Sequence, residues 1–181
     1  MKENISPAKT AVSYGIIFGV IMILEFVIAY AFNIDGAKQP WVGIVNGLLN
    51  FLILPVLFIL LACNNFKSKN GGYISFGECL KAGVSVNVLA AVVFSVFNII
   101  FNMIFPEFQA ETFEKVKEVT LQQNPEMTAE QLEMGMSITK TMMNPFIAAP
   151  ISILMYTVVG LLYSLVIGAI VKKDNPGEQY N

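Results

Sequence analysis

The sequence predicts an all-α, polytopic membrane protein with four transmembrane helices, and two observations lead to this fold class. Charged residues make up only 13% of the 181 residues and hydrophobic residues 55%, whereas soluble domains carry roughly 25% charged residues. The apolar residues are gathered in four long blocks, at about 11–32, 41–63, 82–105 and 145–171. Because about 20 helical residues cross the hydrocarbon core of a bilayer, each block is long enough to span it.

The first block, 11–32, follows a basic start formed by Lys2 and Lys9. A basic start also precedes a cleavable signal peptide, whose apolar core is roughly 7–15 residues long. Here the apolar run is longer than that, and Glu25 interrupts its second half. We therefore expect an uncleaved membrane anchor.

The second block, 41–63, opens with Trp41 and contains Pro55. Tryptophan is enriched at membrane–water interfaces, so Trp41 is predicted to mark the outer end of this helix. Proline is a common cause of sharp bends in helices, so Pro55 is predicted to kink the middle of the block.

The third block, 82–105, is preceded by Ser75 and Glu78. A serine followed three residues later by a glutamate is the pattern of a capping box, which predicts that the helix starts directly after Ser75. Cys63 and Cys79 flank the preceding loop. We place this loop on the reducing cytoplasmic side of the membrane, so we expect the cysteines to be small apolar fillers rather than a disulfide.

Residues 106–144 separate the third block from the fourth and contain two helical patterns. The first pattern runs from Glu107 to Gln123, and Pro125 ends it. The second begins with Thr128 and Gln131, which again form a capping-box pattern. We predict an extracytoplasmic helical hairpin that is amphipathic enough to lie on the bilayer or to cap the bundle.

The distribution of lysine predicts that both termini face the cytoplasm. Seven of the 11 basic residues lie on one side if the termini and the connection between the second and third blocks are cytoplasmic. Lysine and arginine are enriched in cytoplasmic loops. Residues 106–144 carry three lysines against seven glutamates and then lie outside. We expect a multi-pass protein of the bacterial cytoplasmic (inner) membrane.

The composition excludes several classes of function. The net charge is −2 and there is no histidine. A nucleic-acid partner requires clustered basic charge, which this sequence lacks. Without histidine, the commonest general base and metal ligand are both missing, and no paired acid, base and nucleophile is recognisable. We therefore expect neither an enzyme nor a protein that binds a metal or a cofactor.

Small residues recur at a spacing of four along three of the apolar blocks. Such residues allow the backbones of membrane helices to approach to van der Waals contact. We therefore expect packing faces, and a bundle that acts through helix packing with itself, as a homo-oligomer, or with a membrane-protein partner. The residues are Gly15, Gly19, Gly43, Gly47, Gly160, Ser164 and Gly168.

Glu25 is the one acid or base inside the four apolar blocks. An ionisable residue in a membrane helix is costly and marks a functional site by default. At about 1.5 Å per residue, Glu25 lies about 5 Å from the middle of its block, in the same outer layer as polar residues of the other blocks. We predict a hydrogen-bonded cluster around Glu25. The candidate partners are Asn46, Asn50, Asn98 and Tyr156.

Three roles remain open for this cluster. Glu25 is a polar staple between helices, at about 0.5–2 kcal/mol; or it is the proton or cation site of a small transporter or channel component; or it belongs to a site for an unknown ligand. Replacing Glu25 by glutamine separates these roles, because a staple survives the change and a proton-coupled step does not.

Three features together resemble a known family. They are the Gly15 to Gly19 spacing, the segment 74–78 (ISFGE) before the third block, and the Phe105-Pro106 pair that ends this block. The chain resembles the bacterial integral membrane family catalogued as domain of unknown function 4199, which is common in Bacteroidota. The resemblance covers nearly the whole chain. It implies four helices in the cytoplasmic membrane, and it implies no activity and no catalytic residues.

Overall fold

The computed structural model describes residues 6–34 and 39–176, and helices make up most of this part of the chain. Lys2, part of the basic start noted above, lies outside the described residues. In chain order the helices are α1 (Pro7–Ala31), α2 (Pro40–Leu48), the π-helix η1 (Leu49–Ile53), α3 (Leu54–Lys69), α4 (Phe76–Ile104), α5 (Pro106–Gln123), α6 (Ala129–Met143) and α7 (Pro145–Val171).

Four helical segments are long and apolar enough to cross a membrane. Large apolar side chains cover their outer surfaces; for example, Ile44, Leu154 and Ile170 are 64%, 66% and 77% exposed. Exposing such side chains to water costs about 25 cal/mol per Å², so these surfaces suit contact with lipid. The protein is therefore a membrane protein, and the all-α fold class is confirmed. The segments are Pro7–Ala31, Trp41–Lys69, Phe76–Ile104 and Pro145–Val171.

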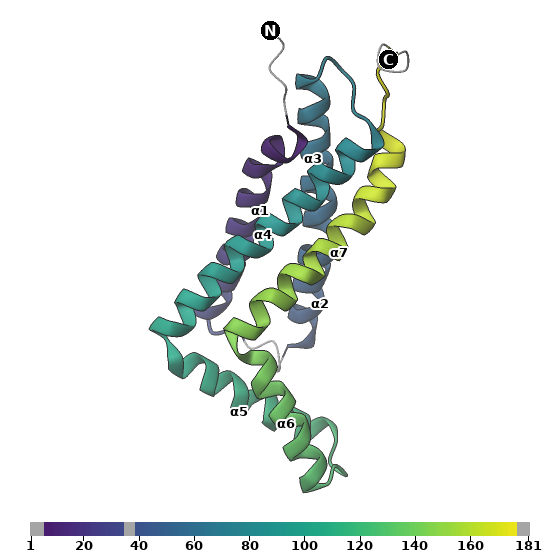
Figure 1. Ribbon diagram of the computed structural model, residues 1–181. Coiled ribbons are helices and arrows are strands. Elements are labelled where there is room, and N and C mark those ends of the chain that lie inside the picture. Colours follow the sequence, from purple (N-terminus) through teal and green to yellow (C-terminus); the bar gives the residue numbers. More distant parts are fainter. Residues whose placement is uncertain (1–5, 35–38, 177–181) are drawn as a thin grey trace.

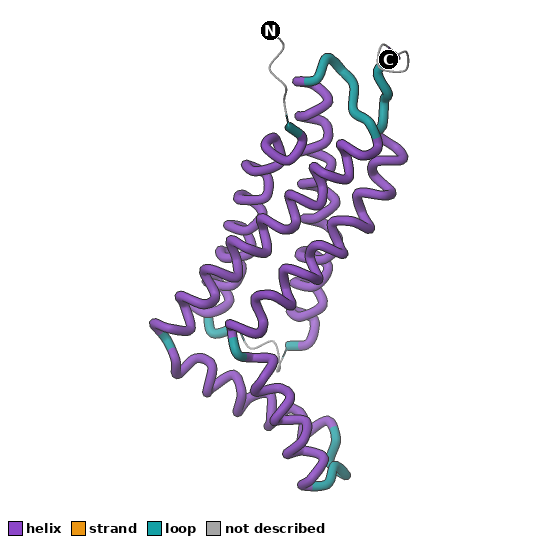
Figure 2. Tube along the Cα trace, in the orientation of Figure 1, coloured by secondary structure: helices purple, strands orange, loops and turns teal. Residues whose placement is uncertain are grey.

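α4 is the central helix of the bundle. It packs most extensively against α7 and α1, and α3 contacts all three of these helices. Figure 1 shows the start of α1, the end of α3 and the end of α7 at one end of the bundle, with α5 and α6 at the other. The tube view shows that the loops lie at the ends of the helices (Figure 2).

α4 begins where the sequence predicts. The Ser75 hydroxyl accepts a hydrogen bond from the Glu78 N–H at 3.3 Å, and the Glu78 carboxylate accepts one from the Ser75 N–H at 2.7 Å. The capping box is therefore present. Directly before it, Ile74 and Lys173 exchange two backbone hydrogen bonds, of 3.0 and 2.8 Å. These bonds tie the start of α4 to the end of α7.

The second membrane segment changes its helical form in the middle. The sequence predicted a kink at Pro55, and the structure places the π-helix η1 (Leu49–Ile53) directly before this proline. π-Helical turns are rare and are frequent at functional sites. Before η1, α2 makes no extensive contact with the other long helices, whereas α3, after it, packs against α1, α4 and α7. The half of this segment that α2 forms therefore stands apart from the bundle.

Two helices fill the stretch between α4 and α7, as the sequence predicts. α6 starts after a second capping box, in which the Thr128 hydroxyl accepts from the Gln131 N–H at 3.3 Å and the Gln131 side chain accepts from the Thr128 N–H at 3.0 Å. α5 turns away from the line of α4 (Figure 1) and contacts α6.

Aromatic rings fix the start of α5 to the bundle. The ring centroid of Phe108 lies 5.6 Å from that of Phe26, 5.5 Å from that of Tyr30 and 5.3 Å from that of Phe101, each in an edge-on arrangement. Each edge-on pair contributes about 0.5–1.5 kcal/mol beyond burial of its area. The first turn of α5 is therefore held against α1 and α4.

The two cysteines lie in the core between α3 and α4. Both are free and fully buried, in agreement with the prediction of small apolar fillers. The Cys63 thiol lies 3.8 Å from the backbone carbonyl oxygen of Cys79, toward which it donates.

Candidate functional site

Glu25 of α1 meets two asparagines of the second membrane segment. The Asn50 amide nitrogen donates to the Glu25 carboxylate at 2.6 Å, to the Asn46 side-chain oxygen at 2.7 Å and to the Asn46 backbone carbonyl at 3.1 Å. Three acceptors around one atom identify it as the nitrogen of the amide. The structure therefore brings together Glu25, Asn46 and Asn50 of the predicted cluster.

The other end of the Asn50 amide is unsatisfied. Asn50 is only 7% exposed, and its Oδ1 atom has no hydrogen-bond partner among the described residues. A buried acceptor without a partner costs about 1–3 kcal/mol. Because protein atoms enclose this oxygen, it is an unsatisfied acceptor inside the cluster and not a contact point for a ligand.

A cavity of about 840 Å³ lies beside Glu25. α1, α2, η1, α4 and α7 all contribute residues to its wall. The cavity exists because α2 stands apart from the other helices at this depth, and most of its wall is apolar. Its polar lining residues are Glu25, Gln39, Asn46, Asn50, Ser152 and Tyr156.

Tyr156 of α7 is 5% exposed and lines the same cavity. Its ring stacks on that of Phe51 at a centroid distance of 5.3 Å and meets that of Phe18 edge-on at 6.1 Å. The structure shows no hydrogen bond between Tyr156 and Glu25, both of which are described. The structure therefore places Tyr156 in the wall of the site, held by aromatic contacts.

Asn98 does not reach Glu25. It is not among the cavity residues, and its side-chain oxygen and backbone carbonyl accept hydrogen bonds of 3.2 and 2.8 Å from the Asn102 amide on the same helix. The side of α4 that faces α1 here carries aromatic residues: the ring centroids of Phe94 and Phe97 lie 6.3 and 5.7 Å from that of Phe26. The amide of Asn98 is therefore excluded from the α1–α4 interface that would lead to Glu25.

Gly15 and Gly19 lie in a tight contact between α1 and α4. A Cβ atom added at Gly15 would lie 2.7 Å from the Leu89 Cβ, and one added at Gly19 would lie 2.7 Å from the Val93 Cβ. Both distances are too short for carbon atoms, so only glycine permits this approach of the two helices.

The small residues of α7 make a similar contact with α4. A Cβ atom added at Gly160 would lie 2.9 Å from the Asn87 Cβ, and one added at Gly168 would lie 3.1 Å from the Phe76 Cδ2. Ser164 is fully buried, and its hydroxyl oxygen occupies the space that a Cβ atom at Gly83 would need. These residues form the α4–α7 interface.

Gly43 and Gly47 make no such contact within the chain. A Cβ atom added at either residue would meet no described atom within 4 Å. Both residues line the Glu25 cavity instead, where the absence of a side chain widens the space beside Asn46 and Asn50.

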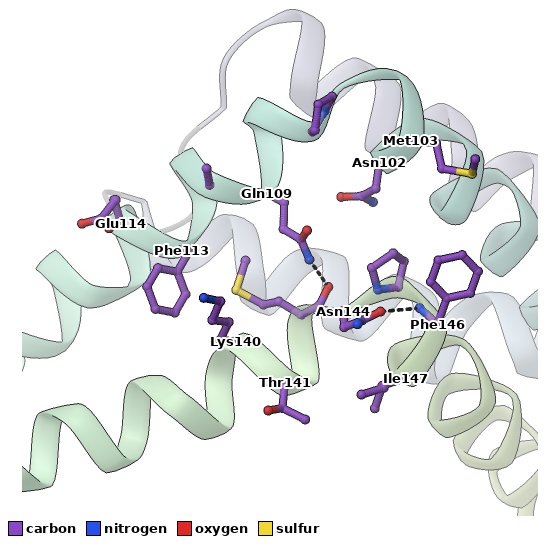
Figure 3. Close-up of a pocket in the computed structure, with 14 residues that line it drawn as sticks. Asn102, Met103, Gln109, Phe113, Glu114, Lys140, Thr141, Asn144, Phe146 and Ile147 are labelled. Atoms are coloured by element: carbon purple, nitrogen blue, oxygen red, sulfur yellow. Dashed lines mark hydrogen bonds between the residues drawn. The ribbon is translucent and has the colours of Figure 1, made fainter.

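A second cavity, of about 880 Å³, lies where α4, α5, α6 and α7 meet (Figure 3). Gln109 donates to the Met143 carbonyl oxygen at 2.7 Å, and the Asn144 side chain caps the first turn of α7 with a bond of 3.0 Å. Lys140 and Glu114 give the wall one charge of each sign. Among the described residues, no unpartnered buried polar atom belongs to this wall, so the Glu25 cavity is the stronger candidate.

A comparison with family models identifies the family of the chain. The model described as "Protein of unknown function (DUF4199)" matches residues 13–173. The chain belongs to this family. The resemblance seen in the sequence is thus confirmed, and the matched DUF4199 region includes Glu25 and the rest of the candidate site. No curated protein and no solved structure gave a significant match. The DUF4199 description assigns no activity.

Proposed function

We propose that this DUF4199 protein acts by binding rather than by catalysis, and that Glu25 is the proton or cation site of a small carrier or channel component. The proposal rests mainly on one observation. Glu25 lines a cavity and bonds to Asn50, and no positively charged residue is among the described residues of its wall. A carboxylate without a cationic partner in an apolar surrounding is costly, so it is suited to take up a proton or a cation from the cavity.

We also propose the bacterial cytoplasmic membrane as the location, with both termini in the cytoplasm. Lys67, Lys172 and Lys173 are all near the end of the bundle where α1 starts and α7 ends. The Lys67 amine donates to the Val171 carbonyl oxygen at 2.9 Å. Because lysine is enriched on the cytoplasmic side, this end is assigned to the cytoplasm, and α5 and α6 to the opposite side.

Proton flux into proteoliposomes tests the role of Glu25. Vesicles that enclose a pH-sensitive dye are loaded with the wild type, with Glu25→Gln, or with the control Glu133→Gln, whose residue is exposed on α6. We expect an imposed pH gradient to decay faster with the wild type and the control than with empty vesicles. With Glu25→Gln, the decay should fall to the rate of empty vesicles. Equal decay with the wild type and Glu25→Gln overturns the role of Glu25 as a proton site.

A second candidate function is association with another membrane helix through α2. Trp41, Ile44 and Leu48 of α2 are 62%, 64% and 49% exposed, and Gly43 and Gly47 meet no described atom. Glycines at a spacing of four are typical of close helix pairs. A helix of a second copy or of a partner protein that packed against them would fill the Glu25 cavity.

Cysteine crosslinking in native membranes tests this association. In a background with Cys63→Ala and Cys79→Ala, Ile44→Cys on α2 is compared with Ile170→Cys on α7, where the native side chain is 77% exposed. We expect a specific crosslinked dimer, or a crosslink to one captured membrane protein, from position 44 alone. Equal crosslinking at both positions, or none at 44, contradicts association through α2.

A further inference from the structure

We infer that the ligand of the Glu25 cavity is an amphiphilic primary amine, with an ammonium group bound by Glu25 and an apolar body in the rest of the space. This inference rests on the proposed function of Glu25 as a cation site, and it names the chemical class of the cation. Three features of the cavity lead to it: its acceptors, its size and its aromatic residues.

The polar part of the cavity offers hydrogen-bond acceptors. The Glu25 carboxylate has two oxygens and receives one hydrogen bond, from Asn50, among the described residues. An ammonium group carries three donors and no acceptor. It would therefore bond to the second oxygen of the Glu25 carboxylate and supply the positive charge that the described wall lacks.

The size of the cavity argues against a bare proton or metal ion as the whole ligand. A volume of about 840 Å³ lies within the range of about 300–1,000 Å³ that is typical of sites for small organic molecules. Mg²⁺ and Ca²⁺ take at least six oxygen ligands, and among the described residues no group of three or more Asp, Glu, Cys or His side chains could hold a metal ion. An ion at Glu25 would leave most of the apolar wall without a partner.

Aromatic rings in the wall favour a cation over an anion. Phe26, Trp41, Phe51 and Phe94 all line the cavity with Glu25. The faces of aromatic rings attract ammonium groups by about 0.5–2 kcal/mol, and their apolar surface also accommodates the body of an amphiphile. An anionic head group would meet the Glu25 carboxylate with no compensating positive charge in the described wall.

Binding of a matched pair of probes tests the inference. The probes are 4-phenylbutylamine and its uncharged analogue 4-phenylbutanol, titrated into the full-length protein in phosphatidylcholine nanodiscs. Trp41, the one tryptophan of the sequence, lines the cavity, so its fluorescence reports occupancy directly. We expect the amine to bind at least tenfold more tightly than the alcohol. In Glu25→Gln this preference should disappear, because the charge-assisted hydrogen bond is lost.

A second pair of variants keeps the test independent of any effect of Glu25→Gln on folding. Gly47→Leu should fill the cavity, because a Cβ atom at Gly47 meets nothing within 4 Å, and it should weaken amine binding at least tenfold. Gly135→Leu on α6 also meets nothing but is outside the cavity, so it should bind the amine as the wild type does. Circular dichroism checks that each variant is folded.

The lipid of the nanodisc distinguishes between two possible sources of the amine. If the natural ammonium group belongs to a phospholipid head group, phosphatidylethanolamine nanodiscs should compete with the probe and lower its apparent affinity. If the natural ligand is a free amine, the affinity should be the same in both lipids. Either result agrees with a primary amine as the ligand.

Equal affinity for the amine and the alcohol, or a preference for the amine that survives Glu25→Gln, overturns the inference. The proton-flux experiment tests the proposed function separately, because proton flux requires no amine. If proton flux depends on Glu25 but the amine does not bind, a primary amine is excluded as the ligand and the proton site remains. Amine binding without flux leaves a binding site in a protein that does not transport protons.

Discussion

The Tyr163 hydroxyl of α7 donates a hydrogen bond of 2.9 Å to the backbone carbonyl oxygen of Phe51 in η1. In a regular helix this carbonyl would accept from the N–H of residue 55, but Pro55 has no N–H. Tyr163 therefore supplies, from another helix, the donor that the proline removes. Without water in the bilayer core, each unsatisfied backbone group costs several kcal/mol, so the contact explains how the second membrane segment accommodates Pro55 next to the site.

We predict that Tyr163→Phe destabilises the protein by about 1 kcal/mol, the net contribution of a typical hydrogen bond. Pro55→Ala restores an N–H that can bond to the Phe51 carbonyl, so in that background Tyr163→Phe should cost much less. Thermal unfolding in detergent of the wild type, both single variants and the double variant measures this coupling. A cost for Tyr163→Phe that is the same in both backgrounds would show that the hydroxyl does not replace the missing donor.

We predict that Gly19→Ala destabilises the bundle by about 1–3 kcal/mol, because the added Cβ atom crowds a packed interface. It would lie 2.7 Å from the Val93 Cβ and 2.9 Å from the Ala90 carbonyl oxygen, and the backbone atom cannot move away as a side chain can. The matched control is Gly135→Ala on α6, where a Cβ atom meets nothing. Alanine is the better helix former, so thermal unfolding should show the control unchanged or slightly stabilised. Equal melting temperatures for the two variants would contradict the tight contact.

We predict that Ser75→Ala lowers stability by about 1 kcal/mol through loss of the helix cap. The Ser75 hydroxyl accepts from the Glu78 N–H at 3.3 Å, and alanine has no acceptor. Ser75→Asn retains an acceptor and should recover most of the loss. Hydrogen exchange of the first turn of α4 measures the effect locally: faster exchange is expected in Ser75→Ala and near wild-type exchange in Ser75→Asn. Unchanged exchange in both variants would show that the cap does not hold this turn.

The sequence predicts best those elements whose contacts lie within a few residues along the chain. The capping boxes at Ser75 and Thr128 form as expected, because their partners lie three residues away on the same chain. The four apolar helices follow from block length. The contact between Asn50 and Glu25 could also be predicted, because both are polar residues at similar depth in neighbouring segments.

The cavity could not be predicted, because it depends on how far one helix stands from the others. Gly43 and Gly47 have the spacing of a packing face, and within this chain they line an open space instead. The spacing of small residues on a helix indicates that another helix can approach closely, but it does not indicate that such a helix is present. Pro55 was the one local signal that this segment departs from a regular helix.

The structure does not place Asn98 in the Glu25 cluster, and the reason is a different one. Several polar side chains in the membrane segments bond to the carbonyl four residues earlier in their own helix: Asn87 to Gly83 at 3.1 Å, and Thr157 to Ile153 at 2.7 Å. This local partner satisfies a donor without any second helix. A polar residue in a membrane helix therefore does not by itself predict a contact between helices, and depth alone could not assign Asn98 to the Glu25 cluster.

The last prediction concerns the link between α5 and the bundle. Phe108 joins them through its ring contacts with Phe26, Tyr30 and Phe101. Replacing this partly buried ring by alanine removes three aromatic pairs, each worth about 0.5–1.5 kcal/mol. Because the lost contacts lie at the start of α5, we expect Phe108→Ala to loosen α5 rather than to unfold the membrane helices.

Hydrogen exchange measured helix by helix tests this prediction. Phe108→Ala should accelerate exchange in α5 several-fold and leave α3 and the middle of α4 near their wild-type rates. Leu121→Ala is the matched control, since Leu121 lies near the other end of α5 and is 41% exposed, and it should change exchange little. If Phe108→Ala accelerates exchange equally in all helices, the ring contributes to global stability. If it changes nothing, α5 is held by other contacts, such as the bond from Gln109 to Met143 at 2.7 Å.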